Sequence, residues 1–328
     1  MDYFGTIGPS CDNIDTLEKL FQAGMTGIRI NLSHINLPQC GHYIDNIKAA
    51  ASKLGINAKI LIDIQGPELR IGDLDKPLNL TEGEYVHLGD YGIPVPKILL
   101  ESLNTGDTVL IDDSSILLKV ADKSKNSVKC SIIRGGTLTS RKSIAAEGIE
   151  IDGPTLTEDD YMNIEKINQY GITGVMLPFV RSKEDLQNLK TALINAHAAS
   201  TQIYAKIENQ RGVNSLSSFI DLADEIIIAR GDLGNSMPLY ELPETQKKLA
   251  GICNKNKKSF MVVTQLLHSM INSAVPTRAE VSDIFNSVLD GASSLMLTGE
   301  TAIGKYPVDA MKYLVKTAEE ALKYKNTL

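Results

Sequence analysis

Three residues near the middle of the chain have the types and spacing needed to bind a divalent cation beside a fixed positive charge. Lys206 and Glu208 are two positions apart at the end of an apolar run, 202–207, that is typical of a β-strand. Because side chains alternate along a strand, both point to the same face. Asp232 follows the next such run, and two carboxylates plus substrate oxygens are common ligands of magnesium. An internal Lys206–Glu208 ion pair without a metal is the alternative interpretation.

Other residues near these three are suited to binding anions. The chain leaves the run 225–229 through Arg230-Gly231-Asp232-Leu233-Gly234, where exposed backbone N–H groups can bind a carboxylate. Arg29 and Lys206 supply positive charge where a transferring phosphoryl group would lie, and phosphoryl transfer depends mostly on positioning and charge neutralisation. The pattern therefore indicates an anionic, phosphorylated substrate, although each motif alone is also compatible with an ordinary strand end.

The elements that must position these residues alternate along the chain. Short apolar runs typical of buried parallel strands are separated by segments with helical periodicity. The predicted strands are 3–7, 27–32, 59–64, 174–179, 202–207, 225–229, 260–264 and 294–297. The predicted helices are 13–23, 42–54, 182–197, 242–256, 278–289 and 308–323. This alternation predicts a (β/α)₈ TIM barrel, in which the chemistry lies at the carboxyl ends of the strands.

The alternation breaks once, over residues 73–152. This stretch is rich in glycine and turns, has no helical periodicity, and contains short β-like runs at 108–111, 116–120 and 127–133. We therefore predict a small all-β domain, 73–152, inserted after the third barrel strand. The barrel would comprise residues 1–72 and 153–328.

Composition narrows the possible partners. The 328 residues carry a formal charge of −7 and no Trp, which argues against a nucleic-acid-binding surface. The four cysteines contain no CxxC pair, and no apolar run is long enough to span a membrane. We therefore expect a cytoplasmic protein without nucleic-acid or membrane partners.

At this point the sequence resembles the pyruvate kinase family over most of its length, from Thr6 to about Tyr313. The resemblance rests on long motifs in a fixed order. These are Thr6-Ile7-Gly8-Pro9, Arg29-Ile30-Asn31-Leu32-Ser33-His34, Asp63 with Gly66-Pro67-Glu68-Leu69-Arg70, Lys206-Ile207-Glu208-Asn209, Ala229-Arg230-Gly231-Asp232-Leu233-Gly234, Pro276-Thr277-Arg278-Ala279-Glu280-Val281-Ser282-Asp283 and Leu297-Thr298-Gly299-Glu300-Thr301-Ala302.

The resemblance implies transfer of a phosphoryl group from phosphoenolpyruvate to ADP, giving pyruvate and ATP in glycolysis. Glu208 and Asp232 would hold Mg²⁺ or Mn²⁺, and Lys206 and Arg29 would neutralise the phosphoryl group. Thr264 would take part in protonating the enolate through water. The backbone amides of Gly231 and Asp232 would receive the substrate carboxylate.

The resemblance also implies a monovalent cation and a nucleotide site. K⁺ would be coordinated by Asn31, Ser33, Asp63 and the carbonyl of Ile64. The nucleotide would face the residues Asn31, His34, Arg70 and Lys142. Glu68 stands where potassium-independent members often carry Lys, which favours potassium dependence.

Three departures from the family pattern bear on nucleotide use. Pro178 stands where many members have Ser, and Ile303 stands where a Lys is common. The inserted segment reads Lys142-Ser143-Ile144-Ala145-Ala146-Glu147-Gly148 in place of Lys-Gly-Val-Asn-Leu-Pro-Gly. We expect ADP use to be more sensitive to these changes than binding of the metal and the three-carbon acid.

The chain stops at Leu328, so we expect the family's C-terminal effector domain to be absent. The segment 276–283 lies at a subunit interface in the family, which favours a homodimer through the barrel; capping of the next helix by Thr277 is the alternative. Two other functions stay open. One is a metal-dependent lyase acting through enolpyruvate, and the other is a phosphoenolpyruvate-binding or pyruvate-binding paralogue with little or no kinase activity.

Overall fold

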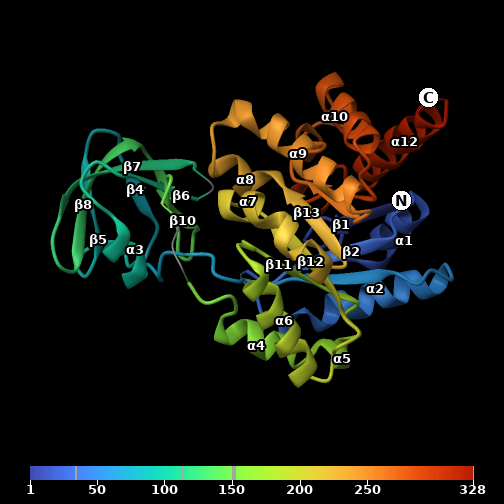
Figure 1. Ribbon diagram of the computed structural model, residues 1–328, viewed down its shortest axis with the longest axis horizontal. Helices are drawn as coiled ribbons and strands as arrows, with labels where there is room; N and C mark the ends of the chain where they lie inside the picture. Colours follow the sequence, from blue (N-terminus) through green and yellow to red (C-terminus); the bar gives the residue numbers. More distant parts are fainter. Residues whose placement is uncertain (34, 113, 150–152, 328) are drawn as a thin grey trace. The chain divides into compact units, whose positions relative to one another are not determined.

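The computed structural model describes residues 1–33, 35–112, 114–149 and 153–327. The chain divides into two compact units (Figure 1). The barrel unit comprises Met1–Gly66, Thr155–Leu233 and Tyr240–Leu328. The inserted unit comprises Pro67–Pro154 and Gly234–Leu239.

Eight parallel strands close the barrel in the order β1-β15-β14-β13-β12-β11-β3-β2. They are β1 Asp2–Thr6, β2 Gly27–Asn31, β3 Lys59–Asp63, β11 Gly174–Leu177, β12 Gln202–Ile207, β13 Glu225–Ala229, β14 Phe260–Val263 and β15 Ser294–Met296. The predicted TIM barrel is therefore confirmed, and the inserted unit begins after its third strand.

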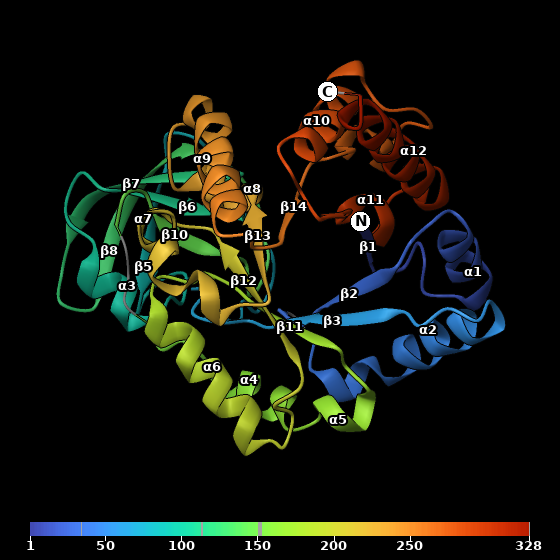
Figure 2. The same cartoon turned by 45° about the vertical axis from the view of Figure 1, so that its right-hand side comes forward.

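The barrel strands are apolar because both of their faces are buried. Side chains from different strands fill the interior, including Phe4, Leu61, Met176, Tyr204 and Met261. Helices cover the outside, as the views in Figures 1 and 2 show. They are α1 Ile14–Gln22, α2 Gly41–Lys53, α4 Glu158–Ile164, α5 Ile167–Tyr170, α6 Lys183–Asn195, α7 Gln210–Phe219, α8 Arg230–Asn235, α9 Leu242–Lys255, α10 Arg278–Leu289, α11 Gly299–Ala302 and α12 Pro307–Lys325. Short 3₁₀ turns are Leu37–Cys40, Ile220–Leu222, Leu239–Glu241 and His268–Ile271.

Helices α4 and α7 go beyond the sequence prediction. Their apolar stripes are short, and α7 contains Gly212 and several serines, which weaken a helical signal. Both helices begin at a strong N-cap. The Asn209 side chain accepts a hydrogen bond from Gly212 N at 2.7 Å, and Thr157 and Asp160 form a capping box. Capping thus marks these helices where periodicity does not.

The inserted unit is built mainly from antiparallel strands. A five-stranded sheet has the order β10-β6-β7-β8-β5, and β4 pairs with β9. The strands are β4 Leu78–Leu80, β5 Tyr85–Gly89, β6 Thr108–Ile111, β7 Ile116–Lys123, β8 Ser127–Arg134, β9 Gly136–Leu138 and β10 Ile144–Ala146. The predicted inserted β domain is confirmed, and the structure adds one short helix to it: α3, Lys97–Ser102, begins after Pro96 and buries Leu99 and Leu100. Six residues are too few to show helical periodicity.

Within the part of the chain that the structure describes, no helix is both long and apolar enough to cross a membrane.

Candidate active site

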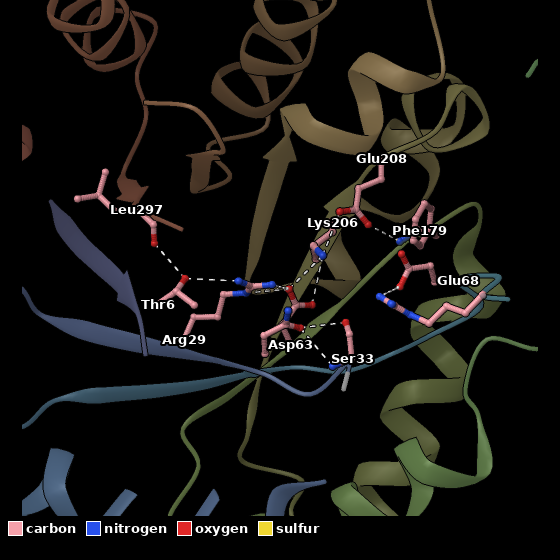
Figure 3. A network of polar contacts seen from close by, with 11 residues as sticks. Thr6, Arg29, Ser33, Asp63, Glu68, Phe179, Lys206, Glu208 and Leu297 are labelled. Carbon is pink, nitrogen blue, oxygen red and sulfur yellow. Dashed lines mark hydrogen bonds and ion pairs between the residues drawn. The ribbon is translucent and has the colours of Figure 1, made fainter. Parts of the chain in front are cut away.

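The carboxylate of Asp63 binds two cationic side chains at the carboxyl ends of the barrel strands (Figure 3). Arg29, from β2, donates from Nε at 2.9 Å and from Nη2 at 2.6 Å to Asp63 Oδ2. Lys206, from β12, lies 3.2 Å and 3.1 Å from Oδ1 and Oδ2. Because β11 separates β12 from β3 in the sheet, Lys206 reaches Asp63 past an intervening strand. Asp63 therefore fixes two cations at one point.

Glu208 extends this cluster on the other side of Lys206. Lys206 Nζ lies 3.0 Å from Glu208 Oε1, so the predicted common face is confirmed and the two side chains form an ion pair. Phe179 N donates to Glu208 Oε2 at 2.9 Å. Phe179 has φ +52°, a left-handed conformation that a bulky residue rarely adopts. We call Arg29, Asp63, Lys206 and Glu208 the barrel cluster.

Burial and mutual charge set the ionisation of the barrel cluster. Burial raises the pKa of Glu208 to about 7, with the charges of Asp232 and Asp63 adding to the effect and Lys206 opposing it. Burial alone would lower the pKa of Lys206, but the carboxylates of Asp63 and Glu208 outweigh it and raise that pKa. Lys206 therefore stays protonated at neutral pH.

The residues present fit a divalent cation. Glu208 is almost fully buried, and the negative charge of Asp232 adds to the rise in its pKa. A cation held by both carboxylates would relieve this repulsion and favour the ionised form of Glu208. No group of three His, Cys, Asp or Glu side chains suited to a metal occurs among the described residues. Magnesium often takes one or two carboxylates and completes its shell with water and substrate oxygens.

Thr6 holds Arg29 from the side away from Asp63, a role that the sequence analysis did not assign. Arg29 Nη1 donates to Thr6 Oγ1 at 3.4 Å, and Thr6 Oγ1 donates to the carbonyl of Leu297 at 3.0 Å. Thr6 is buried at the end of β1. The motif Thr6-Ile7-Gly8-Pro9 carried the signal, because a polar residue at a barrel strand end is a candidate for the site.

Thr264 and Gly231 lie side by side. A Cβ built on Gly231 would meet Thr264 Cγ2 at 3.3 Å and Oγ1 at 3.7 Å. Thr264 and Gln265 have φ values of +76° and +57°. Such conformations cost about 1–3 kcal/mol each and collect at functional sites. Together with Phe179, these strained residues directly follow barrel strands β11 and β14.

The predicted potassium ligands are neighbours in the barrel unit. Asn31 Oδ1 accepts from Ser33 Oγ at 2.9 Å and from Ser33 N at 3.2 Å. Ile64 N donates to the carbonyl of Met176 at 3.3 Å. Asp63, the charged member of the set, already carries the ion pairs with Arg29 and Lys206. A monovalent cation would therefore share this carboxylate with two protein cations.

Two of the predicted nucleotide-binding residues belong to the inserted unit and are paired within it. Lys142 Nζ lies 2.7 Å from Asp112 Oδ1. Arg70 pairs with Glu68 and donates to the carbonyl of Arg141 at 2.7 Å, while its buried Nε has no hydrogen-bond partner among the described residues. His34 lies outside the described residues.

The departures from the family pattern differ in their surroundings. Pro178 packs on Gly66: a Cβ there would meet Pro178 Cγ at 2.5 Å, and Gly66 has φ +59°. Ile303 is exposed. Thr277 forms a capping box with Glu280 at the start of α10, as the capping interpretation of that motif predicts.

The buried cations and carboxylates lie at the carboxyl ends of eight parallel strands. This is where TIM-barrel enzymes have their active sites. Comparisons with known proteins narrow this class. The family model "Pyruvate kinase, barrel domain" matches residues 2–311. The chain belongs to the pyruvate kinase family.

Curated relatives match nearly the whole chain. A pyruvate kinase of Bacillus licheniformis is 36% identical over 98% of this chain and 58% of the relative. One of Aeropyrum pernix is 36% identical over 97% of this chain and 70% of the relative. The cytosolic isozyme of Solanum tuberosum is 37% identical over 96% of this chain and 64% of the relative. The chain thus spans about three fifths of the length of the Bacillus relative.

Proposed function

We propose that this chain catalyses phosphoryl transfer from phosphoenolpyruvate to ADP. The observation that carries the proposal is the convergence of Arg29, Lys206 and Glu208 around Asp63 at the carboxyl end of the barrel. Two fixed cations beside two carboxylates suit a substrate that carries both a phosphoryl group and a carboxylate. Family membership supports the same reaction.

In this reaction an oxygen of the ADP β-phosphate forms a bond to the phosphorus of phosphoenolpyruvate. The bond from phosphorus to the enol oxygen breaks, and its electron pair leaves with the enolate. One proton from water then adds to the terminal carbon and gives the methyl group of pyruvate. One proton is consumed for each ATP formed, and no redox change occurs.

The barrel residues divide this work by charge and position. Lys206 and Arg29 stabilise the negative charge on the phosphoryl oxygens during transfer, and the carboxylates of Asp63 and Glu208 keep Lys206 cationic. Asp63 binds both cations and orients them toward the same place. Amides of Gly231 and Asp232 receive the substrate carboxylate. Thr264 lies next to Gly231 and orients the water that protonates the enolate.

Magnesium or manganese on Glu208 and Asp232 would supply the Lewis acidity that stabilises the enolate oxygen. K⁺ near Asn31, Ser33, Asp63 and the Ile64 carbonyl would add positive charge near the phosphate. Both cofactors follow from family membership and fit oxygen donors of these residues.

The proposed nucleotide site is the part most affected by the departures from the family pattern at Pro178, Ile303 and residues 142–148. Asn31, His34, Arg70 and Lys142 are the proposed contacts to ADP. The unpaired Nε of Arg70 supports a role for that side chain in binding an anion. The homodimer and the cytoplasmic location stay predictions.

The experiment is a coupled assay of pyruvate formation with phosphoenolpyruvate, ADP and Mg²⁺. We expect activity that requires all three and that Lys206→Met removes. If phosphoenolpyruvate binds in a Mg²⁺-dependent manner without turnover, the chain is a binding paralogue and the proposal fails. Cleavage or formation of a carbon–carbon bond in place of phosphoryl transfer would favour the lyase.

A further inference from the structure

The backbone at Thr264 is held by a side chain to which neither the sequence motifs nor the proposed reaction assigns a role. Arg230, the first residue of α8, donates from Nη2 at 2.7 Å and from Nε at 3.2 Å to the carbonyl oxygen of Thr264. This carbonyl belongs to a β-branched residue at φ +76° that is followed by a second left-handed residue. Such a conformation persists only where neighbouring groups fix it.

Arg230 is itself fixed by two further helices. Its Nη1 lies 2.7 Å from Asp283 Oδ2 of α10 and 3.5 Å from Gln246 Oε1 of α9. Only 12% of the Arg230 side chain is exposed. The planar guanidinium therefore uses one edge for the Thr264 carbonyl and the other for Asp283. Helices α8 and α9 and strand β13, whose carboxyl end carries Arg230, are neighbours in Figures 1 and 2.

The carbonyl and the side chain of Thr264 are both attached to its α-carbon. Rotation about the N–Cα bond, which would relieve the strained φ of +76°, therefore moves the two groups together. The side chain faces Gly231, one residue before Asp232: a Cβ built on Gly231 would meet Thr264 Cγ2 at 3.3 Å. Holding the carbonyl therefore also holds the Thr264 hydroxyl relative to Gly231.

We propose that Arg230 is a positioning residue for the protonation of the enolate, acting through the peptide of Thr264. The inference rests on the proposed function. Arg230 does not touch the substrate; it keeps the Thr264 hydroxyl and its water at the methyl-forming carbon. Asp283 is the second member of this support, since it holds the guanidinium in the orientation that faces the carbonyl.

The surroundings of Arg230 allow a direct test by chemical rescue. A cavity of about 470 Å³ borders the guanidinium and is lined by Gln246, Gln265 and Asp283 among others. A small guanidinium compound can enter such a space when the Arg230 side chain is shortened. Lys247 lines the same cavity but pairs with Asp290, which makes Lys247→Met a matched control.

The first experiment compares Arg230→Lys, Thr264→Ala and the double variant in the pyruvate-forming assay. We expect Arg230→Lys to lower kcat about 10- to 100-fold, since a small misplacement of a reacting group has effects of this size. The KM for phosphoenolpyruvate should change less than about twofold, because ground-state binding is kept. The double variant should be no slower than Thr264→Ala, because both changes remove one contribution.

The second experiment follows exchange of the pyruvate methyl hydrogens into D₂O by NMR, with Mg²⁺, K⁺ and ATP present. This exchange reports enolate protonation without net phosphoryl transfer. Arg230→Ala should exchange slowly and regain at least tenfold in rate when methylguanidinium is added. Lys247→Met should exchange at the wild-type rate and show no rescue.

The outcomes separate the inference from the proposed function. If the wild type turns over and Arg230→Lys has an unchanged kcat, the inference alone is overturned. The same holds if the losses of kcat from the two single variants multiply in the double variant. Wild-type exchange without ATP formation contradicts the proposed function and leaves Arg230 testable by exchange. Absence of both reactions overturns both. Where an Arg230 variant fails to fold, Asp283→Asn replaces it, with a smaller loss of kcat and the same non-additivity with Thr264→Ala expected.

Discussion

The barrel cluster and Lys142 of the inserted unit differ in how their charges are paired. In the barrel cluster, Arg29 and Lys206 share Asp63, and these side chains are at most 14% exposed. In the inserted unit, Lys142 has its own carboxylate partner, Asp112, and the two side chains are 35% and 28% exposed. Arg141 and Asp73 are more exposed still.

This difference separates two kinds of contribution to function. Buried charges interact strongly and hold one geometry, so that removal of any member leaves another unpaired. Exposed pairs contribute little to stability and break at small cost, so a cation such as Lys142 can exchange its carboxylate for a ligand phosphate. We therefore expect the barrel cluster to govern the chemical step and the cations of the inserted unit to govern nucleotide affinity.

Lys206→Met has the largest expected effect, because it removes the cation that interacts with both Asp63 and Glu208. We expect a loss of at least about 10³-fold in kcat, as for removal of a group that stabilises transition-state charge. Fold and metal binding should remain, as checked by thermal unfolding and by Mn²⁺ titration calorimetry. Full activity in this variant would refute the mechanism.

Glu208→Gln keeps the side-chain shape and an oxygen for Phe179 N but removes the charge proposed to bind the metal. We expect at least about tenfold more Mg²⁺ to be needed for half-maximal activity. Glu244→Gln, in an exposed pair with Lys248 on α9, is the matched control. An unchanged Mg²⁺ requirement in Glu208→Gln would remove Glu208 from the proposed metal site.

Lys142→Met tests the inserted unit. We expect the KM for ADP to rise about tenfold, since one charge-assisted hydrogen bond contributes about 1.5 kcal/mol or more. The melting temperature should hardly change, because the pair with Asp112 is partly exposed. Lys97→Met, which removes another lysine from an exposed pair in the same unit, should leave the KM for ADP unchanged. A kcat loss as large as that of Lys206→Met would erase the distinction between the units.

Asp185→Asn tests whether a buried ion pair outside the barrel cluster contributes to kcat. Asp185 pairs with Arg181 at 2.9 Å and accepts from Thr155 Oγ1 at 2.6 Å, outside the barrel cluster. Burial alone would raise the pKa of Asp185, but hydrogen bonds from Arg181 and Thr155 outweigh it and hold the pKa below its ordinary value of 3.8.

The carboxylate of Asp185 therefore stabilises the fold above its unfolded pKa, and this contribution is lost as the pH falls through the folded pKa. We expect Asp185→Asn to lower the free energy of unfolding at neutral pH by about 1–2 kcal/mol and to flatten its decline in acid. Urea unfolding across the acid range measures both, and kcat should not change. A loss of kcat in the folded variant would contradict the assignment of this ion pair to stability alone.

The barrel and part of the site could be predicted from the sequence. Continuous apolar runs marked the strands because both strand faces are buried, and the alternation of a strand placed Lys206 and Glu208 together. The sequence pattern did not reveal that Asp63 binds both Arg29 and Lys206. The contact between Asp63 and Lys206 crosses β11, so it depends on the order of the strands in the barrel. The role of Thr6 was missed because it includes a contact with Leu297, which follows β15, the last strand of the barrel. The role of the Phe179 amide was missed because it depends on a left-handed backbone conformation that a bulky residue rarely adopts.

Pyruvate formation from phosphoenolpyruvate and ADP with Mg²⁺, measured with and without K⁺, is the first measurement to make. We expect turnover that requires Mg²⁺ and rises with K⁺. Turnover without K⁺ would be consistent with a phosphotransferase but would contradict the K⁺ site proposed at Asn31, Ser33, Asp63 and Ile64. It would also contradict the inference of K⁺ dependence from Glu68. No turnover in the folded chain, with phosphoenolpyruvate still bound in the presence of Mg²⁺, would contradict the account.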